Sequence, residues 1–337
     1  VERAVMAAVQ NPTGAQSLRE LALRKAHQSI LLMIDDNTRS TPQHRILPIV
    51  LRELEEAGVQ SHQITILICL GTHRPLGTTE IEARVGQSVM SRYSCVNLPQ
   101  QPGDFVFLGY TASGTPIEVS KLYLEHDVKI AIGNIIPHMY AGWAGGAKMV
   151  MPGVTSSVTT AKTHLLASRH IDSILGNVDN LVRAEMEEIA VRTGLDFIVN
   201  TIIDEADRVV GIVAGDPVLA HRKGVEWAKP LFTRTIPSQA SIVIAGARPA
   251  DRDLWQGFKP LNNCGRAVRD GGVLILVIHA PEGIAPDHTE LVALGTKSIA
   301  EVRTMLAENL IVDEVAAATY QAYRATRDRI SVVLVSS

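Results

Sequence analysis

The segment from residue 134 to residue 164 holds the densest set of side chains that could do chemistry. His138 lies near its start, a glycine-rich turn (Gly-Trp-Ala-Gly-Gly-Ala-Lys) follows at residues 142–148, and His164 closes it. Glycines permit positive φ and close backbone approach, so N–H groups of this turn could converge on an anion or a flat cofactor. The turn is not a P-loop, because Met149 rather than Ser or Thr follows the lysine. We therefore expect a ligand-binding loop, although a tight structural turn is the simpler interpretation of a Gly-Gly pair alone.

Two earlier loops place polar side chains directly after apolar runs that are typical of strands. The run 30–34 leads to Asp36 and Arg39, and the run 64–70 leads to His73. Carboxyl ends of neighbouring parallel strands meet at one edge of a sheet, where α/β proteins bind ligands. An arginine there could hold a carboxylate or a phosphate. An ion pair between Asp36 and Arg39 is an equally good structural explanation of the first loop.

Alternating strands and helices must position these loops. An apolar run at 128–132 predicts a buried strand before the glycine-rich segment, and a helical pattern begins at about residue 156. Two runs at 197–203 and 208–213 predict a hairpin. A helix is predicted over residues 180–193.

The alternation of strands and helices continues to the end of the chain, which predicts an α/β fold. We expect two α/β domains with mainly parallel sheets and an active-site cleft between the domains. Residues 1–235 would form an N-terminal domain that binds the cofactor and carries out catalysis. Residues 236–337 would form a C-terminal α/β domain that contributes substrate-binding residues.

Composition excludes several classes of protein. The 337 residues are 46% hydrophobic with a net charge of −3, which describes a soluble globular protein without the basic surplus of a nucleic-acid binder. The three cysteines stand far apart, so we expect a reducing cytoplasm and no thiolate metal cage. No apolar run approaches the roughly 20 residues of a membrane helix, and no secretory leader opens the printed sequence. The chain starts within a helical pattern and stops just after a strand, so we expect further native residues at both ends.

Five separated motifs together resemble the lactate racemase family that uses the nickel-pincer nucleotide. They are Asp36-Asn-Thr38-Arg39, Gly71-Thr-His73-Arg74-Pro, Pro137-His138 with Gly142-x-x-Gly145-Gly146-x-Lys148, the later His164, and Gln256-x-x-Lys259. The motifs recur in order over nearly the whole chain. The resemblance is therefore specific for the family and much less specific for the substrate.

The resemblance implies a cofactor and a role for each of these residues. The cofactor is the nickel(II) complex of pyridinium-3,5-bisthiocarboxylic acid mononucleotide, which holds the metal through two sulfurs and a ring carbon, and cofactor-biosynthesis proteins would be partners. The implied roles are an acid/base pair, His73 and His138; a nickel ligand, His164; a cofactor tether, Lys148; further cofactor contacts, Asp36, Thr38, Gly145 and Gly146; and substrate contacts, Arg39, Trp255, Gln256 and Lys259.

The implied chemistry fits these residue types. One base can remove the hydroxyl proton of a 2-hydroxy acid while the hydride of the same carbon passes to an electrophile. Return of the hydride to the other face of that carbon inverts its configuration. Two enantiomers call for two bases, and histidine titrates near neutrality. Nickel(II) accepts sulfur and imidazole donors in a square plane, so a single protein ligand is enough. Arg39 and Lys259 suit the carboxylate of the substrate.

Two departures from the family pattern concern the substrate. Trp143-Ala144 stands where the family commonly has an aromatic residue and serine, and Trp255 stands where lactate-specific members carry tyrosine. A larger or more apolar 2-hydroxy acid, or a sugar acid, is therefore a candidate beside lactate.

The residues alone leave two alternatives open: a zinc-dependent hydrolase with a three-histidine site, and a non-catalytic protein that binds a nucleotide or a carboxylate. We expect Arg183 on the solvated face of its helix, and other histidines, such as His221, at surface or capping positions.

Overall fold

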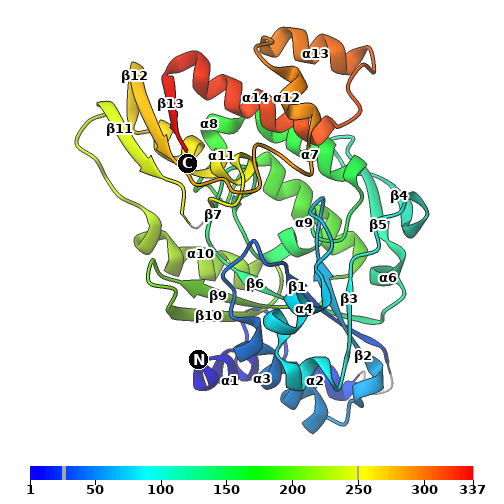
Figure 1. Cartoon of the computed structure of the whole chain (residues 1–337). Coiled ribbons are helices and arrows are strands. Elements are labelled where there is room, and N and C mark those ends of the chain that lie inside the picture. Colours follow the sequence, from blue (N-terminus) through cyan, green and yellow to red (C-terminus); the bar gives the residue numbers. More distant parts are fainter. Residues whose placement is uncertain (25–27, 249, 337) are drawn as a thin grey trace. The chain divides into compact units, whose positions relative to one another are not determined.

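The computed structural model describes residues 1–24, 28–248 and 250–336, which form two compact units (Figure 1). The first unit comprises Val1–Pro137, Trp143–Thr160 and Val178–Thr233. The second comprises His138–Gly142, Ala161–Asn177 and the chain from Arg234 onward. The main segment of the second unit thus begins beside the boundary expected at residue 236, and two short earlier segments belong to the same unit.

The first unit is built on a six-stranded sheet with the order β10-β9-β6-β1-β2-β3. All neighbouring pairs are parallel except β9 and β10, which form the antiparallel hairpin predicted from the sequence. The strands are β1 (Ile30–Asp35), β2 (Ile64–Cys69), β3 (Ser94–Asn97), β6 (Val128–Asn134), β9 (Phe197–Ile203) and β10 (Val209–Gly215). The predicted α/β class with a mainly parallel sheet is therefore confirmed.

Helices cover both faces of this sheet. Figure 1 shows α1 (Glu2–Gln10), α2 (Leu18–Arg24) and α3 (Gln43–Glu56) on one face, with α9 (Leu181–Thr193) and α10 (Leu219–Phe232) on the other. Every residue of β1, β6 and β9 is consequently buried. Burial on both faces explains why these strands are mostly apolar along their length rather than alternating between apolar and polar residues.

The connections place two loops at the same point of the sheet. Ile34 of β1 pairs with Ile68 of β2 on one side and with Ile132 of β6 on the other. The chain leaves β1 towards β2 and β3 and later returns to β6 on the opposite side. The carboxyl ends of β1 and β6 therefore flank the point where the strand order reverses, which is where doubly wound sheets bind ligands.

Short elements complete the first unit and lead to the second. In the first unit these are α4 (Thr78–Val85), α5 (Gln87–Met90), α6 (Lys121–Leu124), the hairpin of β4 (Phe105–Tyr110) and β5 (Pro116–Ser120), and the 3₁₀ turns η1 (Ser61–Gln63), η2 (Pro102–Asp104) and η3 (Gly146–Met149). Residues of β7 (Pro137–His138) and β8 (Gly142–Trp143) pair as a short ribbon. Helix α7 (Ser157–Arg169) begins in the first unit and ends in the second.

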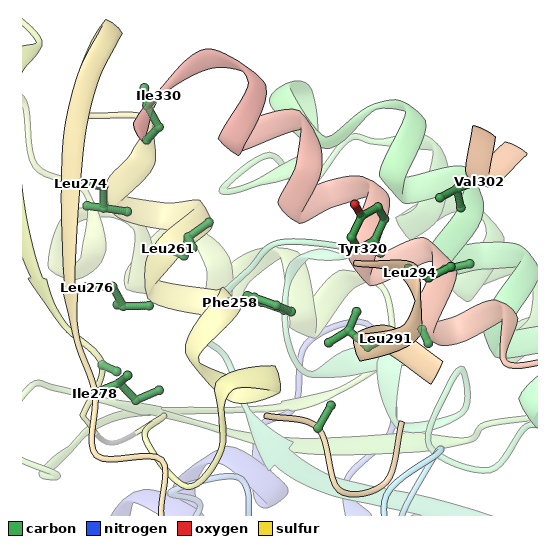
Figure 2. Packing of buried hydrophobic residues seen from close by; sticks show 14 of the residues in the cluster. Phe258, Leu261, Leu274, Leu276, Ile278, Leu291, Leu294, Val302, Tyr320 and Ile330 are labelled. Carbon is green, nitrogen blue, oxygen red and sulfur yellow. The ribbon is translucent and has the colours of Figure 1, made fainter. Parts of the chain in front are cut away.

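The second unit contains a three-stranded parallel sheet of β11 (Ala240–Gly246), β12 (Val268–Val277) and β13 (Ser331–Val335), with β12 in the centre. Its helices are α8 (Ile171–Ile174), α11 (Leu254–Gly265), α12 (Glu290–Leu294), α13 (Ile299–Ala307) and α14 (Glu314–Arg329). Figure 2 shows the core, in which Leu274 and Leu276 of β12 belong to one cluster with Phe258 of α11 and Tyr320 of α14. Both units are therefore α/β in character.

Within the described ranges, no helix has the length and the apolar content that crossing a membrane requires.

The core of the second unit gives a first prediction. Leu276 is fully buried in this cluster, so Leu276→Ala should lower the free energy of unfolding by about 2–5 kcal/mol through lost burial and the cavity left behind. Val312 is 92% exposed, and Val312→Ala should change stability by less than about 0.5 kcal/mol. Urea unfolding of both variants measures the difference. Equal stabilities would contradict this assignment of the core.

Candidate active site

The first part of the candidate site is a pair formed by Asp36 and His73. Oδ2 of Asp36 lies 2.5 Å from Nδ1 of His73. A carboxylate only accepts hydrogen bonds, so Nδ1 of His73 carries the hydrogen and the basic nitrogen of the neutral ring is Nε2. The backbone of this loop is also fixed, because the Gln100 amide donates to the carbonyls of Gly71 and His73 at 3.0 Å each. The arrangement orients an imidazole as a proton acceptor.

The loop after β1 keeps Asp36 ionised. Burial raises the pKa of Asp36, but the charge and hydrogen bond of His73, the charge of Arg39 and the Thr38 hydroxyl outweigh it, so the pKa lies well below its usual value. The Thr38 hydroxyl donates to Oδ1 of Asp36 at 2.6 Å, and Nη1 of Arg39 donates to the Thr38 hydroxyl at 3.0 Å. Asp36, Thr38, Arg39 and His73 therefore form one local network. The contacts of Asp36 and Thr38 with a cofactor, and of Arg39 with a substrate, stay predictions.

Arg84 is a structural partner of this loop that the sequence analysis did not identify. Its guanidinium forms an ion pair with the buried Asp35 and donates to the carbonyls of Asp35 at 3.0 Å and Arg39 at 2.9 Å. Asp35 also accepts from the Thr41 hydroxyl and from the Gln43 amide. Arg84 thus fixes the backbone that carries Arg39. No local pattern marks Arg84, because it is one charged residue on an ordinary helix.

The glycine-rich turn is held from beneath by two buried side chains. The Arg183 guanidinium donates to the carbonyls of Trp143 and Gly145, and Nε2 of His221 donates to the carbonyl of Ala144 at 2.9 Å. Three consecutive carbonyls are therefore engaged by the protein interior. This arrangement fixes the turn that leads into Lys148.

The predicted locations of Arg183 and His221 are wrong. Arg183 is 1% exposed and His221 is fully buried. The sequence could not show this, because helices α9 and α10 each pack against a loop whose carbonyls need donors, and such a need leaves no trace in helical periodicity. Burial lowers the pKa of Arg183 to about 10, so it stays charged at neutral pH. Burial and the charge of Arg183 lower the pKa of His221 well below its usual value, so His221 is neutral.

Gly145 and Gly146 are required by close packing. Both have positive φ, 82° and 59°. A Cβ on Gly145 would lie 2.7 Å from Oδ1 of Asn200, and a Cβ on Gly146 would lie 2.8 Å from the His221 ring. The amide of Gly146 donates to Oδ1 of Asn200 at 2.8 Å. Any other residue would displace the turn, whereas contact of these glycines with a cofactor stays a prediction.

Lys148 and Asn134 lie at the carboxyl end of β6. Lys148 is partly exposed on η3, while its neighbours Ala147 and Met149 are buried. Asn134 is the last residue of β6 and is 3% exposed. Among the described residues, nothing accepts a hydrogen bond from its Nδ2. A buried amide donor of this kind is normally satisfied, so it marks a position where a ligand or water would bind.

In the second unit, Tyr140 brings His138 and His164 to the same aromatic ring. Its centroid lies 4.7 Å from that of His164 and 6.3 Å from that of His138. Burial raises the pKa of Tyr140, so its hydroxyl stays protonated and donates to Thr319 at 3.2 Å. Tyr140 is the other residue that sequence reasoning missed. A tyrosine beside a glycine-rich turn gives no signal beyond its place between two candidate histidines.

Nδ1 of His138 faces a hydrogen-bond donor, whereas Nδ1 of His73 faces an acceptor. The backbone N–H of Tyr140 donates to Nδ1 of His138 at 3.2 Å. A neutral His138 ring that accepts at Nδ1 carries its hydrogen on Nε2. Nε2 of His138 is then a donor, whereas Nε2 of His73 is an acceptor. The two histidines that are predicted to act as acid and base are therefore held as opposite tautomers.

The predicted substrate residues of the second unit lie at the start of α11. Asp253 caps this helix by accepting from the amide of Gln256 at 2.7 Å. The amine of Lys259 donates to Oε1 of Gln256, one turn along the helix. The Trp255 indole stacks on the imidazole of His288, with ring centroids 4.0 Å apart. Local helix geometry therefore places Gln256 and Lys259 on one side of α11. Their contact with a substrate stays a prediction.

Across the described parts of the chain, no group of three or more His, Cys, Asp or Glu side chains could hold a metal ion. The alternative of a three-histidine zinc site therefore gains no support from the side chains. A metal that brings donor atoms within its own cofactor needs fewer protein ligands.

Comparison with known proteins agrees with this reading of the fold and the motifs. The family model of the lactate racemase N-terminal domain matches residues 1–176. A lactate racemase of Lactiplantibacillus plantarum is 31% identical over 288 residues, which are 84% of this chain and 67% of that protein. A lactate racemase of Thermoanaerobacterium thermosaccharolyticum is 29% identical over 292 residues, or 84% of this chain and 66% of that protein. The chain spans about two thirds of the length of these curated relatives.

Solved structures share the fold. The structure of the lactate racemase apoprotein from Thermoanaerobacterium thermosaccharolyticum superposes with a TM-score of 0.88 at 27% identity and covers all of this chain and 81% of that one. A crystal structure of a Thermotoga maritima protein, 22% identical, gives a TM-score of 0.74 over 95% of this chain and 87% of that one, and shares the fold alone. These structural matches place the chain among the α/β proteins with the lactate racemase fold. The chain belongs to the lactate racemase family, whose relatives named above are isomerases.

The neutral His221 gives a prediction on pH dependence. Its pKa is lowered by folding, so below about pH 6.5 the unfolded chain takes up a proton that the folded chain does not. The free energy of unfolding should therefore decrease as the pH is lowered below this value, and His221 should contribute at most about 1.4 kcal/mol per pH unit to that decrease. His221→Gln keeps a donor for the Ala144 carbonyl but cannot titrate, so its slope should be smaller. Urea unfolding at several pH values measures both slopes, and identical slopes would contradict the buried neutral imidazole.

Proposed function

We propose that this protein is a racemase or epimerase that inverts the carbinol carbon of a 2-hydroxy acid with a bound nickel-pincer nucleotide. The observation that carries the proposal is that His73 and His138 are held as opposite tautomers in a chain of the lactate racemase family. We place its action in the cytoplasm, together with proteins that assemble the cofactor.

The residues present suit this cofactor. His164 would be the one protein ligand of the metal, which agrees with a chain that offers no cluster of three metal-binding side chains among its described residues. Lys148 would tether the cofactor, and the unsatisfied amide of Asn134 would give it a buried hydrogen-bond donor. Asp36, Thr38, Gly145 and Gly146 complete the proposed set. When bound, the cofactor supplies an electrophilic ring that accepts a hydride from the substrate carbon.

The side chains of this protein handle the proton and the carboxylate. His73 takes the hydroxyl proton at Nε2, and the ionised Asp36 stabilises the resulting imidazolium. His138 would donate a hydrogen bond from Nε2–H to the substrate oxygen. To give that oxygen a proton, His138 must first be an imidazolium with a hydrogen on Nδ1 as well, which requires it to release the amide of Tyr140. For the second enantiomer the roles of the two histidines exchange. Arg39 and Lys259 bind the carboxylate, and Gln256 and Trp255 contact the rest of the substrate.

Loss of either imidazole should abolish racemisation. His73→Ala and His138→Ala should each lower kcat by at least about 100-fold, because each removes a general acid/base. His62 is an exposed histidine of the same chain, and His62→Ala should leave the rate unchanged. Chiral chromatography of lactate and of larger 2-hydroxy acids, incubated with cofactor-loaded protein, measures the rates. Full activity of both variants would instead support a non-catalytic binding protein.

The Asp36–His73 pair allows a finer test. In Asp36→Asn, the amide group can donate to Nδ1 of His73 and so stabilise the wrong tautomer. We expect kcat to fall by at least about 100-fold while the protein remains folded. The pH profile of kcat should change as well, because the charge that stabilises the imidazolium is lost. An unchanged rate and profile would remove His73 from the proposed mechanism.

The tether is tested by mass rather than by activity. The chain produced together with cofactor-biosynthesis proteins should show a covalent mass increase that Lys148→Ala lacks. Lys121 is an exposed lysine of the same unit, and Lys121→Ala should keep the adduct. Intact-protein mass spectrometry and nickel analysis of the denatured protein give the result. An adduct that survives in Lys148→Ala would place the tether elsewhere.

A further inference from the structure

His288 lies directly against the predicted substrate residue Trp255. The two ring planes differ by 16°, and their centroids are 4.0 Å apart. His288 is 7% exposed, and its Nδ1 lies 2.7 Å from Oδ2 of Asp313. Among the residues that the structure describes, its buried Nε2 has no hydrogen-bond partner. A buried imidazole with one carboxylate partner is therefore stacked on the indole.

Asp313 holds the imidazole in a fixed plane. Its Oδ1 caps α14 by accepting from the amide of Ala316 at 2.9 Å, and its own amide donates to Oε2 of Glu290 at 2.6 Å. Burial raises the pKa of Asp313, but the hydrogen bond from His288 and the amide bond from Ala316 outweigh it, so the group remains a carboxylate. Nδ1 of His288 consequently carries the hydrogen. The ring cannot turn without breaking this bond.

The stack on His288 adds to the other contacts that hold Trp255. Its backbone amide donates to the carbonyl of Ile284 at 2.8 Å, which holds the main chain at the start of α11. The indole is partly exposed and packs against the hydrophobic cluster of the second unit. The flat, anchored imidazole adds a stacking contact on one face of the indole. The next residue, Gln256, is 4% exposed and bonded to Lys259, so the stack adjoins the proposed substrate residues.

We propose that His288, anchored by Asp313, is a positioning residue that fixes the Trp255 indole and so sets which side chains of 2-hydroxy acids the enzyme accepts. This inference rests on the proposed function, in which Trp255 meets the substrate. The unsatisfied Nε2 is consistent with such a role, because a buried polar atom without a partner is retained only where its position matters.

The first arm of the test observes the indole without any turnover. The 337-residue chain has three tryptophans, so this chain labelled with 5-fluorotryptophan should give three ¹⁹F resonances, and Trp255→Phe identifies the one from Trp255. His288→Ala should shift and broaden that resonance alone. His288→Phe keeps a flat ring against the indole and should restore a sharp line, whereas Asp313→Asn should give an intermediate result. An unmoved Trp255 resonance in His288→Ala would overturn the proposal.

A matched control separates positioning from general damage to the unit. Tyr323 stacks on Phe258 with centroids 4.9 Å apart, in the same unit. Tyr323→Leu removes this stack and should leave the Trp255 resonance in place. If Tyr323→Leu moved that resonance as far as His288→Ala does, the effect would be one of unit stability, and the proposal would fail.

The second arm measures selectivity. Racemisation rates of 2-hydroxy acids with small and large side chains are compared for the cofactor-loaded variants. His288→Ala should raise KM for the preferred acid by about three- to tenfold, with a smaller change in kcat, since stacking of aromatic rings is worth that much. Unchanged selectivity beside a moved resonance would overturn the specificity role. Absence of all racemisation in the unchanged protein would instead defeat the proposed function, and the ¹⁹F result would still decide whether His288 fixes Trp255.

Discussion

The burial of the Arg183 guanidinium beneath the glycine-rich turn is the constraint on which the candidate site depends. A buried charge is costly unless hydrogen bonds replace its water. Here the replacements include the carbonyls of Trp143 and Gly145, while His221 takes the carbonyl between them. The turn can therefore adopt only a conformation that satisfies these donors. The position of Lys148 follows from that conformation, since it lies three residues beyond Gly145.

The two candidate acid/base histidines differ because their partners differ. A carboxylate holds Nδ1 of His73, and a backbone N–H holds Nδ1 of His138. The first partner requires a hydrogen on Nδ1, and the second leaves the hydrogen of a neutral ring on Nε2. In these neutral forms Nε2 of His73 accepts a hydrogen bond and Nε2 of His138 donates one. The asymmetry comes from single contacts, so it can be altered by single substitutions.

The two units position their candidate residues in different ways. In the first unit, the reversal of strand order between β1 and β6 brings two loops to adjacent strand ends. In the second unit, one aromatic ring, Tyr140, brings two histidines together, and the cap Asp253 orients the first turn of α11. In the first unit the order of the strands thus positions the candidate residues, whereas in the second unit local packing positions them.

The sequence by itself determined the α/β class and the hairpin at the sheet edge, because these depend on periodicity, and its separated motifs indicated the family. Only the tertiary structure decided that Arg183 and His221 are buried, that Arg84 fixes the loop of Arg39, and that Tyr140 joins His138 and His164. In each of these contacts, the tertiary fold or the direction of a side chain brings the two residues together. Their energies come from donors and acceptors that must be paired once water is removed, and neither helical nor strand periodicity encodes which partner will be there.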